Sequence, residues 1–182
     1  MTVPARAVPV RAVENEFADL LARADPPPAV TRRWVNVTTG GHVSAVIWGT
    51  GAPQTVLLHD AGEDARSYDD LLSTVDIPAA AIDLPGHGRS NATSATPFPG
   101  RLARPVLEAI RSFAPRHRVL AGRGLGALVT LHIAARAPEA IGRLLLVDAP
   151  PAAEPLLSAL KNPPQLVSPD ELAAALAERG NR

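Results

Sequence analysis

Short, uninterrupted apolar runs alternate with helical patterns between residues 55 and 148. The runs are TVLLHD (55–60), AAAIDL (79–84), RVLAG (118–122) and RLLLVD (143–148). Such runs are typical of parallel strands that are buried on both faces. The segments between them, at 64–75, 101–114 and 127–137, place apolar side chains at helical spacing. The pattern predicts an α/β protein with a mostly parallel open sheet of about six strands, helices on both faces and right-handed crossovers.

Different patterns precede this region. The segments WVNVT (34–38) and HVSAVIWG (42–49) alternate apolar and polar residues on either side of a Thr-Gly-Gly turn, which predicts an antiparallel hairpin at a sheet edge. Residues 12–24 place Val13, Phe17, Leu20 and Leu21 on one helical stripe, and the DPPP at 25–28 ends that helix. We therefore expect a helical arm at 1–33 and the core of the domain at 34–150.

After Pro150 the pattern predicts helices and no further strand. In SPDELAAALAERG (168–180), Ser168 is expected to cap a helix, Pro169 to take its first position, Glu171 to complete a capping box and Gly180 to end it. Residues 151–182 are therefore interpreted as a helical segment. Because no later strand is predicted, we expect the strand at 143–147 to present a bare edge and to pair with a second copy or a partner chain.

Composition excludes several classes of function. Eighteen basic residues balance eighteen acidic ones, so no attraction to nucleic acid or to an anionic membrane is expected. The arginines are scattered and are interpreted as solvated. There is no cysteine, no apolar run of signal-peptide length and none long enough to span a membrane. We expect a cytoplasmic protein with no cofactor and no metal site, and with a small-molecule ligand as its possible partner.

The glycine-rich turn GRGLGA (122–127) has two chemically opposite interpretations. As G-x-G-x-x-A it matches a dinucleotide-binding turn, with Gly124 admitting a pyrophosphate and Asp148 reaching a ribose. As G-x-S-x-G it matches a nucleophile elbow in which Gly124 stands where the serine would be. A dinucleotide-binding turn usually follows the first strand of its unit, whereas two or three predicted strands precede this one.

Two further motifs favour the elbow. VLLHDAGEDARSY (56–68) is similar to a His-Gly oxyanion loop, and DLPGHGRS (83–90) is similar to a D-x-[PR]-G-[HF]-G-x-S turn. With GRGLGA, these motifs resemble the α/β-hydrolase family, in particular its esterase-like and lipase-like members, over residues 34–150. The resemblance implies an α/β-hydrolase core that lacks its last strands, and residues 151–182 resemble the start of the family's lid. The dinucleotide-binding interpretation becomes a third alternative.

The resemblance also implies where catalytic groups belong. Gly124 occupies the elbow position but has no hydroxyl, thiol or carboxylate to act as a nucleophile. None of the five histidines lies where the base of a catalytic triad is expected. Asp148 lies where some members place the triad acid, although without a histidine to orient we expect it to cap a turn.

An oxyanion hole is implied at the same place. The N–H groups of Ala61 and Leu125 are expected to form it, and Asp60 stands where the family's loop has glycine. A carboxylate there opposes the negative charge of the transition state, so the hole is expected to be compromised. His59 and His87 are interpreted as hydrogen-bonded scaffold, and the motif residues Asp83 and Arg89 as braces of their turn.

The sequence therefore predicts an esterase-related protein without Ser-His-Asp catalysis in this chain, either a pseudoenzyme or a truncated relative. Whether it is an enzyme stays open. One alternative is a small-molecule binding module with a pocket between the elbow turn and the lid helices. Another is a hydrolase that a partner chain completes.

Overall fold

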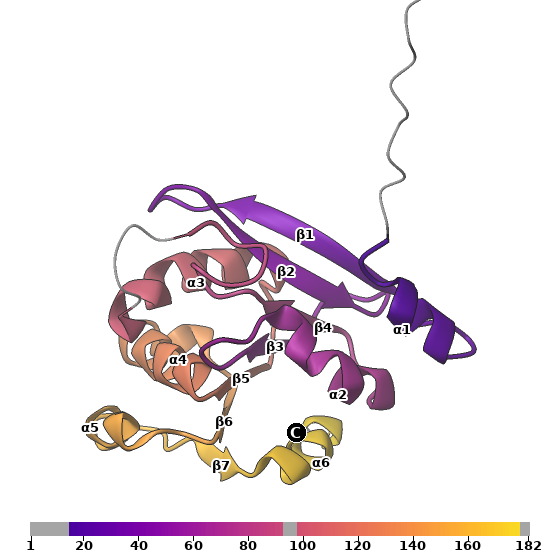
Figure 1. The fold of residues 1–182 in the computed structure, drawn as a ribbon. Coiled ribbons are helices and arrows are strands. Elements are labelled where there is room, and N and C mark those ends of the chain that lie inside the picture. The colour runs from indigo at the N-terminus through magenta and orange to yellow at the C-terminus, as the bar shows by residue number, and fades with distance from the viewer. Residues whose placement is uncertain (1–14, 93–97, 179–182) are drawn as a thin grey trace, which may run out of the picture.

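A computed structural model describes residues 15–92 and 98–178. Seven strands form one sheet in the order β1-β2-β4-β3-β5-β6-β7 (Figure 1). Their bounds are β1 (Val30–Asn36), β2 (His42–Trp48), β3 (Thr55–Leu58), β4 (Ala79–Ile82), β5 (Val119–Arg123), β6 (Arg143–Val147) and β7 (Gln165–Val167). Strands β3 to β7 pair in parallel, while β2 is antiparallel to both β1 and β4. The predicted α/β fold with a mostly parallel open sheet is confirmed.

The predicted hairpin is present at one edge of the sheet. Strands β1 and β2 pair from Val30↔Trp48 to Asn36↔His42. The turn between them is formed by Gly40 and Gly41, whose φ angles of 95° and 75° suit glycine. Strand β1 already begins at Val30, whereas we predicted that the core of the domain begins at residue 34. Helix α1 (Ala18–Arg23) is the described part of the expected helical arm, and Val13 lies outside the described residues.

Helices cover both faces of the sheet because neighbouring residues of each buried strand point to opposite sides. Leu144 and Leu146 of β6 pack with α3 (Pro99–Phe113) and α4 (Leu125–Arg136) on one side. Leu145 and Val147 pack on the other side with α1, α2 (Asp69–Thr74) and α6 (Pro169–Ala177). Figure 1 shows α3 and α4 on one side of the strands and α2 and α6 on the other. Short 3-10 turns at Ala65–Tyr68, Pro138–Ala140 and Pro151–Ala153 and the helix α5 (Glu154–Leu157) complete the elements.

Strand β7 corrects the sequence prediction for the region after Pro150. It pairs in parallel with β6 through Leu145↔Gln165, Leu146↔Leu166 and Val147↔Val167. The expectation of a bare edge at 143–147 is therefore wrong, and self-association through that edge loses its premise. Three residues are too few to show an apolar pattern, which is why the sequence did not indicate this strand.

Helix α6 begins as predicted. Ser168 caps it, Pro169 is its first residue, and Ser168 and Glu171 form the reciprocal hydrogen bonds of a capping box. The helix ends at Ala177, and Gly180 lies outside the described residues. In the described part of the chain, no helix has both the length and the apolar character needed to cross a membrane.

Candidate functional site

The turn between β5 and α4 has the backbone shape of an elbow. Gly124 lies between the strand and the helix with φ 50° and ψ −111°, a conformation that residues with a side chain rarely adopt. A Cβ atom on Gly126 would overlap the carbonyl of Leu58, and one on Gly122 would overlap the carbonyl of Gly126. These two glycines let strand and helix approach closely, so the turn projects residue 124 from the carboxyl end of the strand.

Two backbone N–H groups beside this turn converge on one side chain. Leu125, the first residue of α4, donates its N–H to Oδ1 of Asp60 at 2.6 Å, and Ala61 donates its N–H to the same oxygen at 2.7 Å. The positive end of the α4 dipole favours an anion at this position. The two donors that the sequence assigned to an oxyanion hole therefore hold the carboxylate of Asp60.

The Asp60 carboxylate also takes the space of the elbow side chain. A Cβ atom built on Gly124 would overlap the carboxyl group of Asp60. Glycine at position 124 is thus required by the neighbouring side chain as well as by its backbone conformation. From the sequence we expected Asp60 to approach the hole; the structure places its carboxylate inside.

Asp148 lies at the same end of the sheet, directly after β6. Its carboxylate pairs with Nε of Arg123 at 3.4 Å, and the Arg123 guanidinium also pairs with Glu63 at 3.2 Å. The Asp60 N–H donates to the other oxygen of Glu63 at 3.2 Å. Among the described residues, no hydrogen bond joins Asp148 to a histidine, so its contacts give it no partner for triad chemistry.

His59 is completely buried behind the elbow. Its Nδ1 lies 2.7 Å from the carbonyl of Asp60, and its Nε2 accepts the N–H of Leu84 at 2.9 Å. These contacts require the neutral ring with the proton on Nδ1. Burial lowers the pKa of His59, because the charged ring would lose its hydration. His59 therefore joins the oxyanion loop to the loop that follows β4, as scaffold.

This depressed pKa makes a prediction for stability. The unfolded chain takes up a proton on His59 as the pH falls through about 6.5, whereas the folded chain resists it. We expect the free energy of unfolding to fall below that pH by up to about 1.4 kcal/mol per pH unit for this one group. Urea unfolding at pH 7.5 and pH 5.5 should show a smaller difference in His59→Gln than in the wild type. An unchanged difference would contradict the assignment.

His132 serves as the control for that measurement. Partial burial also lowers its pKa, but it lies in α4, where its ring is near Phe98. We expect His132→Gln to remove less of the pH dependence than His59→Gln does.

Asp83 anchors the loop that follows β4. Its carboxylate is completely buried and accepts the N–H groups of Ala65 and Arg89, at 2.7 and 2.9 Å. The role expected for Asp83 as a brace of its turn is thus present in the structure. The Arg32 guanidinium donates to the same carboxylate at 2.6 Å and to Ser44 Oγ at 2.8 Å. Only 7% of the Arg32 side chain is exposed, so interpreting the arginines as solvated is wrong at this position.

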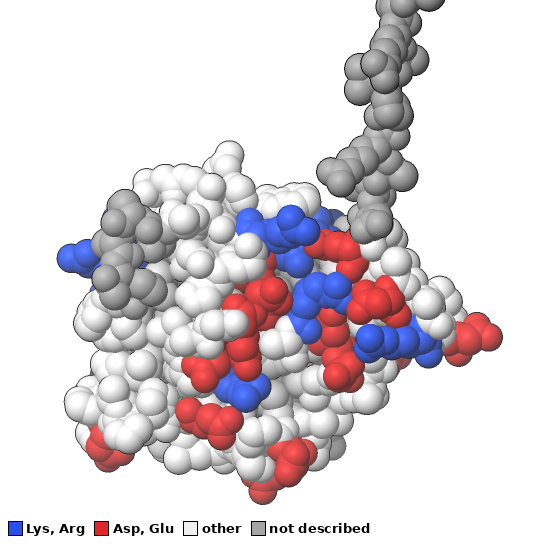
Figure 2. All heavy atoms as spheres, viewed as in Figure 1, with Lys and Arg blue, Asp and Glu red and all other residues white. Residues whose placement is uncertain are grey.

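Other charged side chains form ion pairs that differ in exposure, with 47% of the Asp19 side chain exposed and 11% of the Asp69 side chain. Arg66 pairs with Asp19 at 2.8 Å and with Asp69 at 2.6 Å, which ties α1 to α2. Figure 2 shows acidic and basic side chains interleaved over this face. Within residues 15–92 and 98–178, no three histidine, aspartate or glutamate side chains are grouped as a metal site requires.

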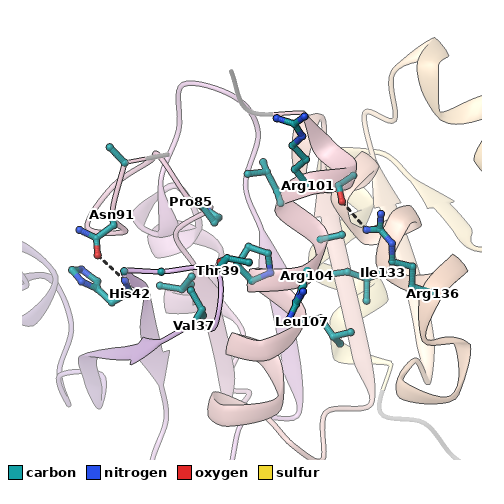
Figure 3. Close-up of a pocket in the computed structure, with 18 residues that line it drawn as sticks. Val37, Thr39, His42, Pro85, Asn91, Arg101, Arg104, Leu107, Ile133 and Arg136 are labelled. Atoms are coloured by element: carbon teal, nitrogen blue, oxygen red, sulfur yellow. Dashed lines mark hydrogen bonds between the residues drawn. The ribbon is translucent and has the colours of Figure 1, made fainter. Parts of the chain in front are cut away.

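A cavity of about 890 Å³ lies away from the elbow. The turn between β1 and β2, the first half of α3 and the end of α4 surround it (Figure 3). None of the predicted pocket residues His59, Asp60, Ala61 and Leu125 lines it. This cavity is therefore not the pocket that we expected between the elbow and the lid helices.

Comparison with known proteins decides between the interpretations of the glycine-rich turn. A family model described as the alpha/beta hydrolase family matches residues 55–181, which include that turn. The chain belongs to the alpha/beta hydrolase family. The dinucleotide interpretation gains no support, and the N–H group of Leu125 at the start of α4, where a pyrophosphate would lie, already holds Asp60.

The relatives of this family member include esterases. The chain is 35% identical over 146 residues to the esterase Rv0045c of Mycobacterium tuberculosis, a match that covers 76% of this chain and 47% of the relative. A solved structure of that esterase superposes with a TM-score of 0.69 at 30% identity, over 92% of this chain and 56% of the other. A pimeloyl-[acyl-carrier protein] methyl ester esterase of Pseudoalteromonas atlantica is 30% identical over 57% of this chain and 39% of its own length. The chain spans about half the length of Rv0045c and less of the other esterase.

Proposed function

We propose that this α/β hydrolase does not cleave esters through an elbow nucleophile and instead binds small molecules. The observation that carries the proposal is the Asp60 carboxylate, which the N–H groups of Ala61 and Leu125 hold at 2.7 and 2.6 Å. These donors would stabilise the oxyanion of an ester in a serine hydrolase. Here they are already bound to an anion that belongs to the protein.

Two separate losses follow from this arrangement. Gly124 supplies no nucleophilic atom, and removal of the nucleophile lowers kcat about a million-fold in a serine protease. Loss of one oxyanion-hole donor lowers kcat by a further factor of about 100 to 1,000 where it has been measured. At this site both donors are engaged, and the carboxylate would repel a second negative charge.

Groups beyond the described residues would not reverse these losses. A histidine supplied by another segment or by a partner chain would act as a base, but Gly124 offers it no proton to remove. Nor would such a base displace Asp60 from its two donors. The elbow therefore argues against cleavage, and binding without cleavage is the function that remains for this fold. The esterase relatives support small acyl compounds as the class of ligand.

The proposal predicts that the purified chain will not hydrolyse p-nitrophenyl acetate or butyrate faster than a heat-denatured sample. The reason is the combined lack of a nucleophile and of a vacant oxyanion hole. Release of p-nitrophenolate, followed at 405 nm, measures it, with an active esterase as the positive control. A fluorophosphonate probe should leave the native chain unlabelled. Saturable turnover that heating abolishes would contradict the proposal.

A further inference from the structure

The cavity of about 890 Å³ at α3 is large enough for a small organic ligand, since such pockets usually measure about 300 to 1,000 Å³. It is formed by segments that are distant in the sequence. The hairpin turn at residues 37–43 forms one wall and residues 100–107 of α3 form another. Ile133 and Arg136 of α4 and three residues of the loop after β4, Pro85, Asn91 and Ala92, contribute the rest (Figure 3).

Much of this wall is apolar. Its apolar side chains come from the hairpin turn, from β2, from the loop after β4 and from both helices: Val37, Val43, Pro85, Leu102, Leu107 and Ile133. Several of them belong to the hydrophobic core, so the wall is continuous with the packed interior of the protein. A ligand that rests on it gains from removing its own apolar surface from water.

The charged residues of the wall all have one sign. Arg101, Arg104 and Arg136 line the cavity, and the described lining contains no aspartate or glutamate. The Arg136 guanidinium donates to the Gly100 carbonyl at 2.7 Å, a neutral partner that fixes its position and leaves its charge uncompensated by that contact. A half-open site with this excess of positive charge favours an anion.

One of these arginines is partly neutralised. Arg104 lies 3.2 Å from the Glu108 carboxylate, which does not line the cavity. Hydrogen bonds from the hydroxyl and N–H of Thr38 hold that carboxylate and lower the pKa of Glu108, so it stays ionised. Arg104 therefore stabilises the contact between α3 and the hairpin. Arg136 is the better candidate to bind the charged group of a ligand.

We propose that this cavity binds a carboxylate with an apolar tail, with the carboxylate at Arg136 and the tail against the apolar wall. The biological role of this cavity rests on the binding function proposed above. The cavity adds to that function a class of ligand and a site away from the elbow. The arginine supplies charge and fork-shaped donors for the carboxylate. The elbow does not compete for the ligand, because Asp60 already occupies its anion-binding groups.

The test is isothermal titration calorimetry of the full chain with octanoate, and with methyl octanoate and octylammonium as probes of the same length. We expect octanoate to bind at least about tenfold more tightly than either analogue, and its affinity to fall as salt is added. Arg136→Gln should weaken octanoate about tenfold and leave methyl octanoate unchanged. Arg116→Gln is the matched control, since Arg116 is exposed and does not line the cavity.

Each outcome has a definite meaning. Equal binding of the three probes, no binding of octanoate, or equal effects of the two arginine variants would overturn the inference. Hydrolysis of methyl octanoate is followed in the same samples. Its occurrence would contradict the proposed function while leaving octanoate binding as a separate result, and absence of both turnover and binding would overturn the cavity assignment alone.

Discussion

Replacing Gly124 with serine is expected to lower the free energy of unfolding by about 3 kcal/mol and to restore no ester hydrolysis. A side chain at φ 50° and ψ −111° costs about 1–2 kcal/mol, and its Cβ would overlap the Asp60 carboxyl group. Displacing that carboxylate or shifting the backbone adds about 1–3 kcal/mol. Urea unfolding followed by circular dichroism measures the change.

The matched control is Gly40→Ser. Gly40 also has a positive φ, at 95°, but a Cβ there meets no atom within 4 Å. We expect it to cost only about 1 kcal/mol, so the difference between the two variants isolates the overlap with Asp60. Adding Asp60→Gly to Gly124→Ser should recover about 1 kcal/mol or more as a coupling energy. Equal losses for Gly124→Ser and Gly40→Ser, with no coupling to Asp60, would show that the two residues do not share this space.

The second large effect is expected from Asp60→Ala, which should lower the free energy of unfolding by about 2 kcal/mol. Two N–H groups donate to the Asp60 carboxylate, and a hydrogen bond to a charged group contributes about 1.5–3 kcal/mol. We expect a total below the sum of two such bonds, because the site is partly exposed and water replaces some of the lost hydrogen bonding. Differential scanning calorimetry checks the result.

Asp70→Ala is the control for this variant. The Asp70 side chain is 95% exposed, and its ion pair with Arg23 is 3.6 Å long. We expect a change below about 0.5 kcal/mol. If Asp60→Ala were as mild as Asp70→Ala, the carboxylate would not be bound as described.

The central strands and the hairpin could be predicted from the sequence because their signals are local. Uninterrupted apolar runs marked β3 to β6, and alternation on both sides of Gly40 and Gly41 marked β1 and β2. Strand β7 lacked such a signal, since three residues gain their structure only by pairing with β6. Arg32 was missed for a similar reason, because only the folded sheet brings it within 2.6 Å of Asp83.

The candidate site was predicted in its parts more than in its arrangement. Three motifs located the elbow, the oxyanion loop and the N–H groups of Ala61 and Leu125. The position of the Asp60 carboxylate depends on the conformation of its side chain, which no pattern in the sequence reports. A signal was nevertheless present: position 124 lacks a side chain while position 60 has one, and the structure shows that one residue fills the space left by the other.

The Asp60 carboxylate should occupy the oxyanion hole that the N–H groups of Ala61 and Leu125 form, and this can be measured directly. Amide protons bound to a carboxylate resonate at low field, so NMR spectra of wild type, Asp60→Ala and Asp70→Ala report on the two donors. We expect the amide signals of Ala61 and Leu125 to lie at low field in the wild type and in Asp70→Ala. Both should move upfield together in Asp60→Ala. Signals at ordinary positions in the wild type, or no movement on removing Asp60, would contradict this placement of the carboxylate.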